Sequence, residues 1–259
     1  MLLAIDVGNS NIVLGSYDRD TLLFTLRISS DTSKTADELA VTIKSVLTLH
    51  NMTPDKIDGA IISSVVPQLT YALKQAVTTL TGKAPLIVEP GIKTGINIKI
   101  DNPAQLGSDL LVDSVAAAAF YPLPAIVIDM GTATTLSVLD ENAALIGGAI
   151  VPGVKISANA LAGNTAQLPH ISIQPPKRAI ATNTVDCMQS GMVFGTAAML
   201  DGMIDRFQKE LGKKCTVIAT GGLAEEICKH TTHEITYNPN LMLEGLKVIY
   251  QKNTERKGK

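Results

Sequence analysis

The feature that most constrains the fold is a short acidic glycine turn that occurs twice in the chain. Asp6-Val7-Gly8-Asn9 follows the apolar run 2–5, and Asp129-Met130-Gly131-Thr132 follows the apolar run 125–128, 123 residues later. Each turn leads into two more candidate strands and then into alternating helices and strands. A repeated unit of this kind predicts two matching turns that face each other across a cleft.

The strand and helix signals around the turns predict two α/β lobes. In the first half, strands are predicted over residues 2–5, 12–15, 22–28, 60–66 and 85–88. Helices are predicted after the capping box Thr35-Ala36-Asp37-Glu38, after Pro67 and within 110–122. In the second half, strands are predicted over 125–128, 134–139, 144–150 and 216–220, and helices over 156–162, 184–211, from 224 and over 239–251. We therefore expect an N-terminal lobe over 1–118 and a C-terminal lobe over 119–259, with a frayed end at 252–259.

The composition limits the partners of such a protein. The chain has 259 residues, 46% of them hydrophobic, and a formal net charge of −2. It can bury a sizeable core, and no overall field draws it to nucleic acid or to an anionic membrane. No apolar stretch reaches the roughly 20 residues that span a bilayer, and the three cysteines indicate reduced thiols. We expect a cytoplasmic protein with a small-molecule partner.

The residues of the two turns suit phosphate chemistry. Gly8 and Gly131 allow backbone amides to approach a phosphate closely, because glycine has no side chain. Asp6 and Asp129 are placed to hold a hydrated metal ion that neutralises the phosphates. One Asp-x-Gly alone is more often a simple hairpin turn. Two copies in the same strand context favour the phosphate interpretation. Further hydroxyl and amide donors in the turns are Asn9, Ser10, Asn11, Thr132, Thr134 and Thr135.

A third glycine site supports a nucleotide ligand. Thr220-Gly221-Gly222-Leu223-Ala224 follows a predicted strand and opens a helix, which leaves room for an adenosine or a phosphate. Alone it would be weak, since a glycine pair there is at least as often a tight packing turn. The chain has no G-x-x-x-x-G-K-[ST] loop, and no G-x-G-x-x-G follows its first strand. The remaining fold class is a duplicated actin-like (ribonuclease H-like) ATPase fold of class α/β, with two lobes around a nucleotide cleft.

The motifs resemble those of type III pantothenate kinases, the bacterial enzymes that begin coenzyme A synthesis. The resemblance spans nearly the whole chain. The two acidic turns match the first and second phosphate motifs of that family, and 220–224 matches its adenosine motif. Other matching segments are Ser63–Pro67, Asp101–Pro103, Gly147–Gly153 and Thr165–Pro169.

The resemblance implies transfer of the γ-phosphate of ATP to the hydroxyl of pantothenate, giving 4'-phosphopantothenate. It implies that Mg²⁺ lies at Asp6, and that a monovalent cation, K⁺ or NH₄⁺, lies beside Asp129. The ATP-binding residues that it implies are Asp6, Val7, Gly8, Asn9, Ser10, Asn11, Ile12, Val13, Thr132, Gly221 and Gly222.

The acceptor site that the resemblance implies centres on Gly107-Ser108-Asp109-Leu110. Asp109 would be the catalytic base and would accept the hydroxyl proton late in the transfer. From local sequence alone, Asp109 is equally well a helix N-terminal cap. Thr184, at the start of the long helix, would complete the substrate pocket of the second subunit of a homodimer. Local sequence favours a simple cap for Thr184 as well.

Two acceptor positions depart from the family pattern. Leu110 stands where the family has an arginine for the substrate carboxylate, and Ile100 stands where many members have a tyrosine. A lost guanidinium–carboxylate pair costs about 1.5–3 kcal/mol unless another cation, such as Lys155, Lys177 or Arg178, replaces it.

These departures keep an alternative function open: a catalytically weak, kinase-like regulator or nucleotide-binding module. Against that alternative, Asp6, Asp109 and Asp129 are all present, and a protein relieved of catalysis does not need all three. Another actin-like phosphotransferase, acting on a sugar or on acetate, fits the two turns but not segments 107–110 and 165–169.

Overall fold

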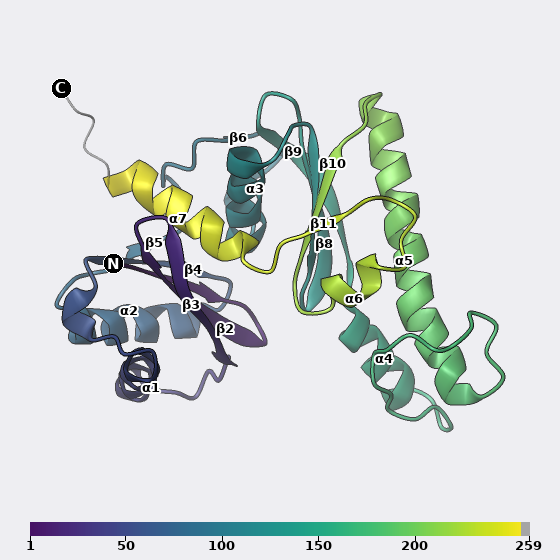
Figure 1. Ribbon diagram of the computed structural model, residues 1–259, viewed down its shortest axis with the longest axis horizontal. Helices are drawn as coiled ribbons and strands as arrows, with labels where there is room; N and C mark the ends of the chain where they lie inside the picture. The colour runs from purple at the N-terminus through teal and green to yellow at the C-terminus, as the bar shows by residue number, and fades with distance from the viewer. Residues whose placement is uncertain (255–259) are drawn as a thin grey trace. The chain divides into compact units, whose positions relative to one another are not determined.

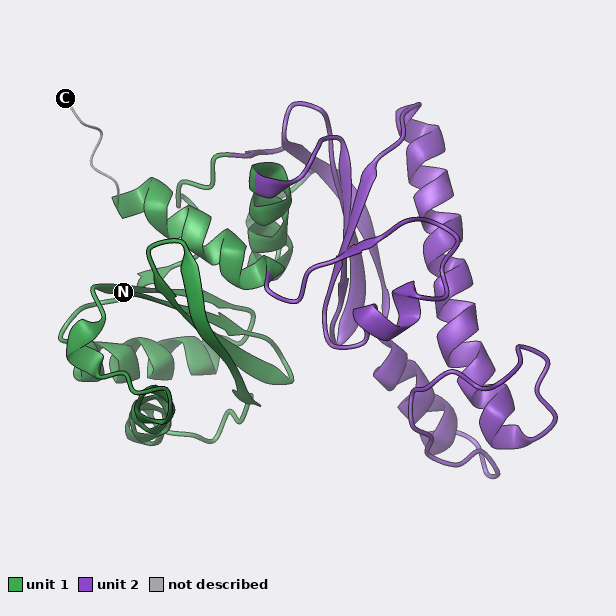
Figure 2. Ribbon diagram, in the orientation of Figure 1, with its two compact units in different colours: residues 1–95, 102–119, 241–259 green, residues 96–101, 120–240 purple. Residues whose placement is uncertain are grey.

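A computed structural model describes residues 1–254 of the chain, which fold into two compact units (Figures 1 and 2). Unit 1 comprises residues 1–95, 102–119 and those from 241 onward, and unit 2 comprises 96–101 and 120–240. Of the segment 252–259, which was predicted to be a frayed end, residues 255–259 lie outside the described part of the chain. Residues 252–254 are helical.

The sheet of unit 1 has five strands in the order β3-β2-β1-β4-β5. Strands β1 and β2 are antiparallel, as are β2 and β3, whereas β4 runs parallel to β1 and to β5. The parallel strands β1 and β4 therefore end at the same edge of the sheet. The strand bounds are Leu2–Val7 (β1), Asn11–Asp18 (β2), Thr21–Ser29 (β3), Gly59–Ser64 (β4) and Leu86–Ile87 (β5).

Helices cover both faces of this sheet (Figure 1). Helices α1 and α2 pack together over one face, where Leu3, Ile5 and Val7 of β1 point into their shared core. Helix α7 lies on the other face and contacts β1 and β4. The helix bounds are Ala36–Leu49 (α1), Pro67–Thr81 (α2), Ser108–Phe120 (α3) and Leu241–Thr254 (α7), with short 3-10 turns η1 at Pro54–Lys56 and η2 at Pro103–Gln105.

Glycines bring α7 close to its neighbours. A Cβ atom added to Gly15 of β2 would lie 2.6 Å from Leu243 Cδ1, and one added to Gly59 of β4 would lie 1.8 Å from the Tyr250 hydroxyl. A Cβ at Gly245 would lie 2.1 Å from the Val112 carbonyl oxygen of α3. Side chains at these positions would push the helix outward. Helix α7 is therefore an integral layer of unit 1.

The sheet of unit 2 repeats the topology of unit 1. Its order is β11-β10-β7-β8-β9-β6, in which β9, β8, β7, β10 and β11 correspond to β3, β2, β1, β4 and β5, and β6 is added at the edge. The directions match as well, because β7-β8-β9 is an antiparallel meander and β10 is parallel to β7 and β11. The strand bounds are Asn97–Ile98 (β6), Ala125–Met130 (β7), Ala133–Leu139 (β8), Ala144–Pro152 (β9), Thr216–Thr220 (β10) and Thr236–Tyr237 (β11).

Three helices cover one face of the second sheet. Helices α4 (Val154–Gly163), α5 (Thr184–Leu211) and α6 (Ala224–Cys228) share a hydrophobic core with β7, β8 and β10. Buried residues of α5 recur at Val193, Ala197, Leu200 and Ile204, which is the spacing of one helical face. The middle of this 28-residue helix is thus packed into the shared core.

The topology confirms the predicted internal duplication and the α/β class. The compact units divide the chain differently from the predicted lobes 1–118 and 119–259, since α7 belongs to unit 1 and residues 96–101 belong to unit 2. The predicted strand 60–66 ends at Ser64, because Pro67 starts α2 and the chain must turn before it. Within residues 1–254, no helix combines the length and the apolar character that a membrane crossing requires.

Candidate functional site

In unit 1, the candidate site lies where β1 and β4 end. Asp6 is the second-to-last residue of β1, and in the parallel register it stands opposite Ser63 of β4. The chain turns away directly afterwards, at residues 8–10, before β2 begins. Carboxyl ends of neighbouring parallel strands are a common location for ligands in α/β proteins.

The first acidic turn is closed by hydrogen bonds. The Gly8 amide donates to the Asn11 carbonyl oxygen at 3.0 Å, and the Ser30 hydroxyl donates to the Gly8 carbonyl oxygen at 2.6 Å. A Cβ atom at Gly8 would lie 3.3 Å from the Asn11 carbonyl oxygen, which leaves little room for a larger residue. The turn is therefore a fixed feature of the sheet edge.

The predicted ATP-binding residues of this segment differ in what they expose. Val7 and Ile12 are fully buried, so their side chains belong to the core and cannot touch a ligand. Val13 is half-buried in β2. Asn9, Ser10 and Asn11 are exposed and offer amide and hydroxyl groups. The turn thus presents a polar rim above an apolar base.

The first turn of α3 is attached to the same sheet edge. The Ser63 hydroxyl donates to the Ser108 hydroxyl oxygen at 3.0 Å, and the Ser108 hydroxyl donates to the Ser64 carbonyl oxygen at 3.1 Å. Ser108 is the first residue of α3 and Asp109 is the second. These two bonds place Asp109 at the edge of the sheet that carries Asp6.

Asp109 is held locally as well. Its Oδ1 atom accepts a hydrogen bond from the Leu110 amide at 2.9 Å. A Cβ atom at Gly107 would lie 2.4 Å from that same Oδ1 atom. Asp109 is the second residue of α3 and is therefore not its N-cap, although its carboxylate accepts one amide of the first turn. Its second oxygen remains available for chemistry.

In unit 2, the second acidic turn occupies the equivalent place. Asp129 is the second-to-last residue of β7 and stands opposite Thr220 of β10, as Asp6 stands opposite Ser63. Gly131 and Thr132 are exposed. A Cβ atom at Gly153 would lie 2.2 Å from the Thr132 carbonyl oxygen. Because Gly153 is the N-cap of α4, it sets the start of that helix directly against the turn.

The predicted adenosine motif follows β10 and also depends on glycine. Gly221 has φ +97°, a conformation that side-chain-bearing residues rarely adopt. A Cβ atom there would lie 2.6 Å from the backbone carbon and oxygen of Met130. Gly221 thus brings the chain against the end of β7, and Gly222 beside it is exposed. The tight-packing interpretation of this glycine pair is therefore correct for Gly221, whose packing partner is the second acidic turn itself.

The predicted acceptor residues do not all lie in one unit. Gly107, Ser108, Asp109 and Leu110 belong to unit 1, whereas Ile100 and Thr184 belong to unit 2. Within unit 2, Ile100 lies two residues after β6 and is half-buried.

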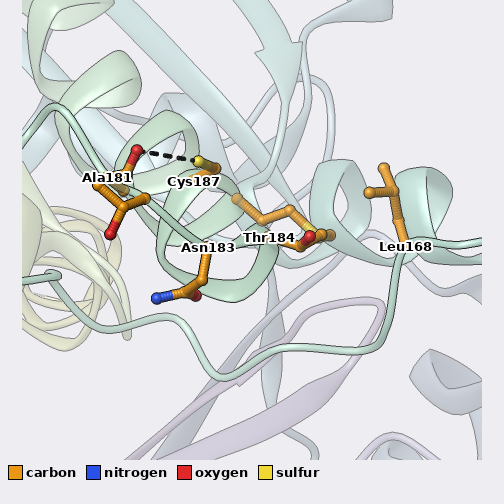
Figure 3. A pocket seen from close by; sticks show the side chains of 7 residues that line it. Leu168, Ala181, Asn183, Thr184 and Cys187 are labelled. Carbon is orange, nitrogen blue, oxygen red and sulfur yellow. Dashed lines mark hydrogen bonds between the residues drawn. The ribbon is translucent and has the colours of Figure 1, made fainter.

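Thr184 is the first residue of α5, but it is not the cap. Asn183 is the cap, and its side chain accepts a hydrogen bond from the Asp186 amide at 2.9 Å. Thr184 lines a surface hollow of about 440 Å³, where the Cys187 thiol donates to the Ala181 carbonyl oxygen at 3.5 Å (Figure 3). The cap interpretation of Thr184 was therefore wrong by one residue. The hollow is lined by Leu168, Ala181, Thr182, Asn183, Thr184, Cys187 and Met188.

The oxygen donors of the turns match a cation that arrives with phosphate. Across residues 1–254, no three His, Cys, Asp or Glu side chains gather into a metal-binding group. Mg²⁺ bound with a nucleotide needs only one or two carboxylates, since phosphates and water supply the other ligands. One aspartate at each turn, with neighbouring hydroxyl and carbonyl oxygens, fits such an ion.

Two functional features escaped the sequence reasoning. Ser63 lies within a segment matched to the family, but its partner Ser108 is 45 residues away and no local pattern joins them. The close approach of Gly153 to the second turn was likewise not foreseen, although a glycine directly before a helix is a signal for it. Both features concern how the site residues are held.

Solved structures of other proteins share this fold. Component A of (R)-2-hydroxyglutaryl-CoA dehydratase from Acidaminococcus fermentans matches with a TM-score of 0.57 and 15% identity, covering 98% of this chain and 99% of that one. The activator of 2-hydroxyisocaproyl-CoA dehydratase from Clostridium difficile, solved with bound ADPNP, matches with a TM-score of 0.54 and 12% identity, covering 100% and 99%. With the repeated topology, these likenesses identify a duplicated actin-like ATPase fold.

Sequence comparisons are more specific. The model of the type III pantothenate kinase family matches residues 2–206. A type III pantothenate kinase of Exiguobacterium sp. strain AT1b is 44% identical, covering 98% of this chain and 99% of the relative. One of Moorella thermoacetica is 42% identical, covering 98% and 100%. The fold, the two acidic turns and these matches over nearly the full length lead to one conclusion: the chain belongs to the type III pantothenate kinase family.

Proposed function

We propose that this protein transfers the γ-phosphoryl group of ATP to the primary hydroxyl of pantothenate. The product is 4'-phosphopantothenate, and the reaction is the first step of coenzyme A biosynthesis. The observation that carries the proposal is the similarity, at 42–44% identity over 98% of the chain, to curated type III pantothenate kinases. The hydrogen-bonded placement of Asp109 beside the first acidic turn supports it. As an ATP-dependent biosynthetic enzyme, it would act in the cytoplasm.

ATP binding is assigned to the glycine segments of both units. In unit 1, the backbone of 6–13 and the exposed Asn9, Ser10 and Asn11 would hold phosphate oxygens. In unit 2, Thr132, Gly221 and Gly222 complete the assignment, since glycine leaves space for a base or a sugar. The solved activator with bound ADPNP supports an ATP-type ligand for this fold.

Asp6 is the residue assigned to Mg²⁺ and Asp129 the residue assigned to a monovalent cation, K⁺ or NH₄⁺. When bound, such ions neutralise phosphate charge and orient the transferring group. Asp6 is half-buried at the end of β1. Its backbone is held in place by the parallel pairing with β4, in which Asp6 stands opposite Ser63. Asp129 has the equivalent position opposite Thr220.

Asp109 is the proposed catalytic base. Phosphoryl transfer proceeds through a loose transition state, so the enzyme gains most from positioning and charge. The Oδ1 atom of Asp109 is occupied by the Leu110 amide, which leaves Oδ2 to accept the hydrogen bond of the pantothenate hydroxyl. As the new oxygen–phosphorus bond forms, the bond from the γ-phosphorus to the bridging oxygen breaks and ADP leaves, and the hydroxyl proton passes to that carboxylate.

The acceptor site is assigned to Ile100, Gly107, Ser108, Asp109, Leu110 and, from a second subunit, Thr184. We propose a homodimer because large exposed apolar side chains gather around α4 and the start of α5. Ile156 and Leu161 lie on α4, whereas Ile180 and Val185 flank the N-cap of α5. Ile180 has 86% of its surface exposed, which a second subunit would cover. Because Asn183 supplies the cap, the Thr184 hydroxyl is not needed for that purpose.

The deciding experiment measures product directly. The purified protein, supplied with ATP, Mg²⁺, K⁺ and millimolar pantothenate, is expected to form phosphopantothenate detectable by mass spectrometry. Asp109→Asn is expected to lower turnover by at least about a hundredfold while ATP still binds, because the amide cannot accept the proton. Absence of product from the wild-type protein would refute the proposal.

The second candidate is a kinase-like nucleotide-binding module, and the observation that favours it is Leu110. Without a guanidinium at this position, the acceptor carboxylate lacks its usual partner. ATP binding without any transfer to pantothenate, in the same assay, would support this alternative.

A further inference from the structure

We propose that Ser63 is a positioning residue that orients the Asp109 carboxylate through Ser108. The inference rests on the proposed function, in which Asp109 is the base. Ser63 is fully buried, so it cannot touch a substrate. Its influence on the reaction must pass through the residues that it contacts.

The contact runs from the sheet into the first turn of α3. Ser63 donates its hydroxyl proton to Ser108 at 3.0 Å, and Ser108 donates its own to the Ser64 carbonyl oxygen at 3.1 Å. One acceptor lies at the first residue of α3 and the other at the last residue of β4. The start of α3 is thus attached to two successive residues of β4. Removal of the Ser63 hydroxyl leaves one of these two attachments.

The next link is the position of Asp109 relative to its neighbours. Asp109 follows Ser108 directly, and its Oδ1 atom accepts the Leu110 amide at 2.9 Å. The same oxygen lies so near Gly107 that a Cβ atom there would be 2.4 Å away. The carboxylate is confined on both sides by backbone that moves with the first helical turn. A shift of that turn would therefore move the base.

Ser63 also connects the base to the first acidic turn. In the register of β1 and β4, it is the partner of Asp6. Ser63 is thus linked to both proposed site carboxylates. The pairing of β1 and β4 links it to Asp6, the residue assigned to the metal, and its hydroxyl links it through Ser108 to Asp109, the proposed base. Displacement of a reacting group by about 1 Å can lower the rate about a hundredfold.

The test compares Ser63→Ala with Ser63→Thr. Ser63→Ala is expected to lower kcat about tenfold and to change the KM for ATP less than about twofold, because binding groups stay in place. Ser63→Thr keeps the hydroxyl on a side chain that suits a strand and is expected to restore kcat to within about twofold. A parallel fall of kcat and of the folded fraction, with no rescue by threonine, would overturn the proposal.

A matched control deletes a different hydroxyl at the same strand end. Thr70 of α2 donates to the Ser64 hydroxyl oxygen at 2.7 Å and to the Val66 carbonyl oxygen at 3.1 Å, and neither bond involves Ser63 or Ser108. Thr70→Ala is expected to lower the Tm without a comparable fall in kcat. If Thr70→Ala lowers kcat as much as Ser63→Ala does, the effect is one of general packing and the proposal fails.

A double substitution tests the route through Asp109. In the Asp109→Asn background, Ser63→Ala is expected to leave the small residual turnover unchanged, since the carboxylate that it orients is gone. A further tenfold fall would show that Ser63 acts elsewhere.

A cycle of Ser63→Ala and Ser108→Ala in thermal unfolding tests the hydrogen bond independently of any acceptor. The two losses in Tm are expected to be non-additive. If wild-type protein forms no phosphopantothenate, the proposed function fails whatever this cycle shows. If it does form product while Ser63→Ala equals wild type, only the positioning role fails. Additive losses in Tm would refute the contact itself.

Discussion

At the scale of single residues, Gly107 leaves the space that the Asp109 carboxylate occupies. Gly107→Ala would place a methyl group 2.4 Å from Asp109 Oδ1, and the carboxylate would have to rotate away. We expect kcat to fall about tenfold with little loss of Tm, because a side-chain end can move at low cost. Steady-state kinetics and thermal unfolding measure the two effects.

The control for this substitution is Gly163→Ala at the end of α4, where a Cβ atom meets no heavy atom within 4 Å. It should leave kcat unchanged. An unaltered kcat in Gly107→Ala would contradict the proposed placement of the base.

Leu110 is the residue at which specificity is most open to test. Leu110→Arg adds a guanidinium beside the base, where the pantothenate carboxylate is proposed to bind. The KM for pantothenate is expected to fall about tenfold, in keeping with a charge-assisted pair of about 1.5 kcal/mol. Ala104→Arg adds the same charge at an exposed position of η2 and should not lower the KM. A KM that rises in Leu110→Arg would mean that the carboxylate binds elsewhere.

The pH dependence of thiol modification tests whether Cys228 is buried as the structure shows. Burial, aided by the nearby Asp201 carboxylate, raises the pKa of the Cys228 thiol to about 11. At pH 8, three units lower, roughly 0.1% of that thiol is thiolate, and the thiolate is the form that reacts. We expect iodoacetamide to modify the exposed Cys187 first, and the rate at Cys228 to rise about tenfold per pH unit up to its pKa.

Peptide mass spectrometry of the folded protein follows both cysteines. Cys187→Ser should remove the fast phase. Rapid modification of Cys228 at pH 8 would contradict its burial.

At the scale of secondary-structure elements, the second acidic turn depends on two glycines that come from other segments. A side chain at Gly153 would collide with the Thr132 carbonyl, and one at Gly221 would collide with the Met130 backbone while holding φ at +97°. Because the obstacles are backbone atoms, we expect Gly153→Ala and Gly221→Ala each to lower the free energy of unfolding by about 1–3 kcal/mol or more. ATP affinity should fall with it.

Denaturant unfolding and nucleotide titration measure these losses. Gly202→Ala, in the interior of α5 with open space around it, is the control and should gain up to about 1 kcal/mol. Normal ATP affinity in a folded Gly221→Ala would separate this motif from the nucleotide.

The elements that could be predicted from sequence are those with local causes. The Thr35–Glu38 capping box forms as expected, with both of its reciprocal hydrogen bonds, and α5 has the predicted bounds because an asparagine cap and Gly212 delimit it. The two-residue strands β6 and β11 were not predicted, since they pair only because longer strands lie beside them. The Ser63–Ser108 bond was missed for the same reason. It links residues whose proximity exists only after the sheet and α3 have formed.

At the scale of the whole molecule, the proposed homodimer can be tested by charge. Ile180 projects from the segment before α5 with 86% of its surface exposed. Ile180→Asp would place a carboxylate in the proposed apolar contact and is expected to shift micromolar protein from dimer to monomer. Multi-angle light scattering after size exclusion reports the mass. Turnover should fall in parallel, because Thr184 would no longer reach a partner.

The control for that substitution is Leu49→Asp. Leu49 lies at the end of α1 with 78% of its surface exposed, so the change is equally drastic but distant in sequence from the proposed contact. It should leave the dimer intact. A wild-type protein that is monomeric at micromolar concentration would contradict the dimer proposal.

Helix α7 is the last described element to be synthesised, although it packs on the first sheet of the chain. The strands of that sheet lie within residues 2–87. Until α7 leaves the ribosome, Gly15 and Gly59 lack the Leu243 and Tyr250 side chains that pack on them in the folded protein. The strands and helices of unit 2 are complete by Asn240. The half of the protein that is translated first therefore receives its last layer only when the final described helix has been made.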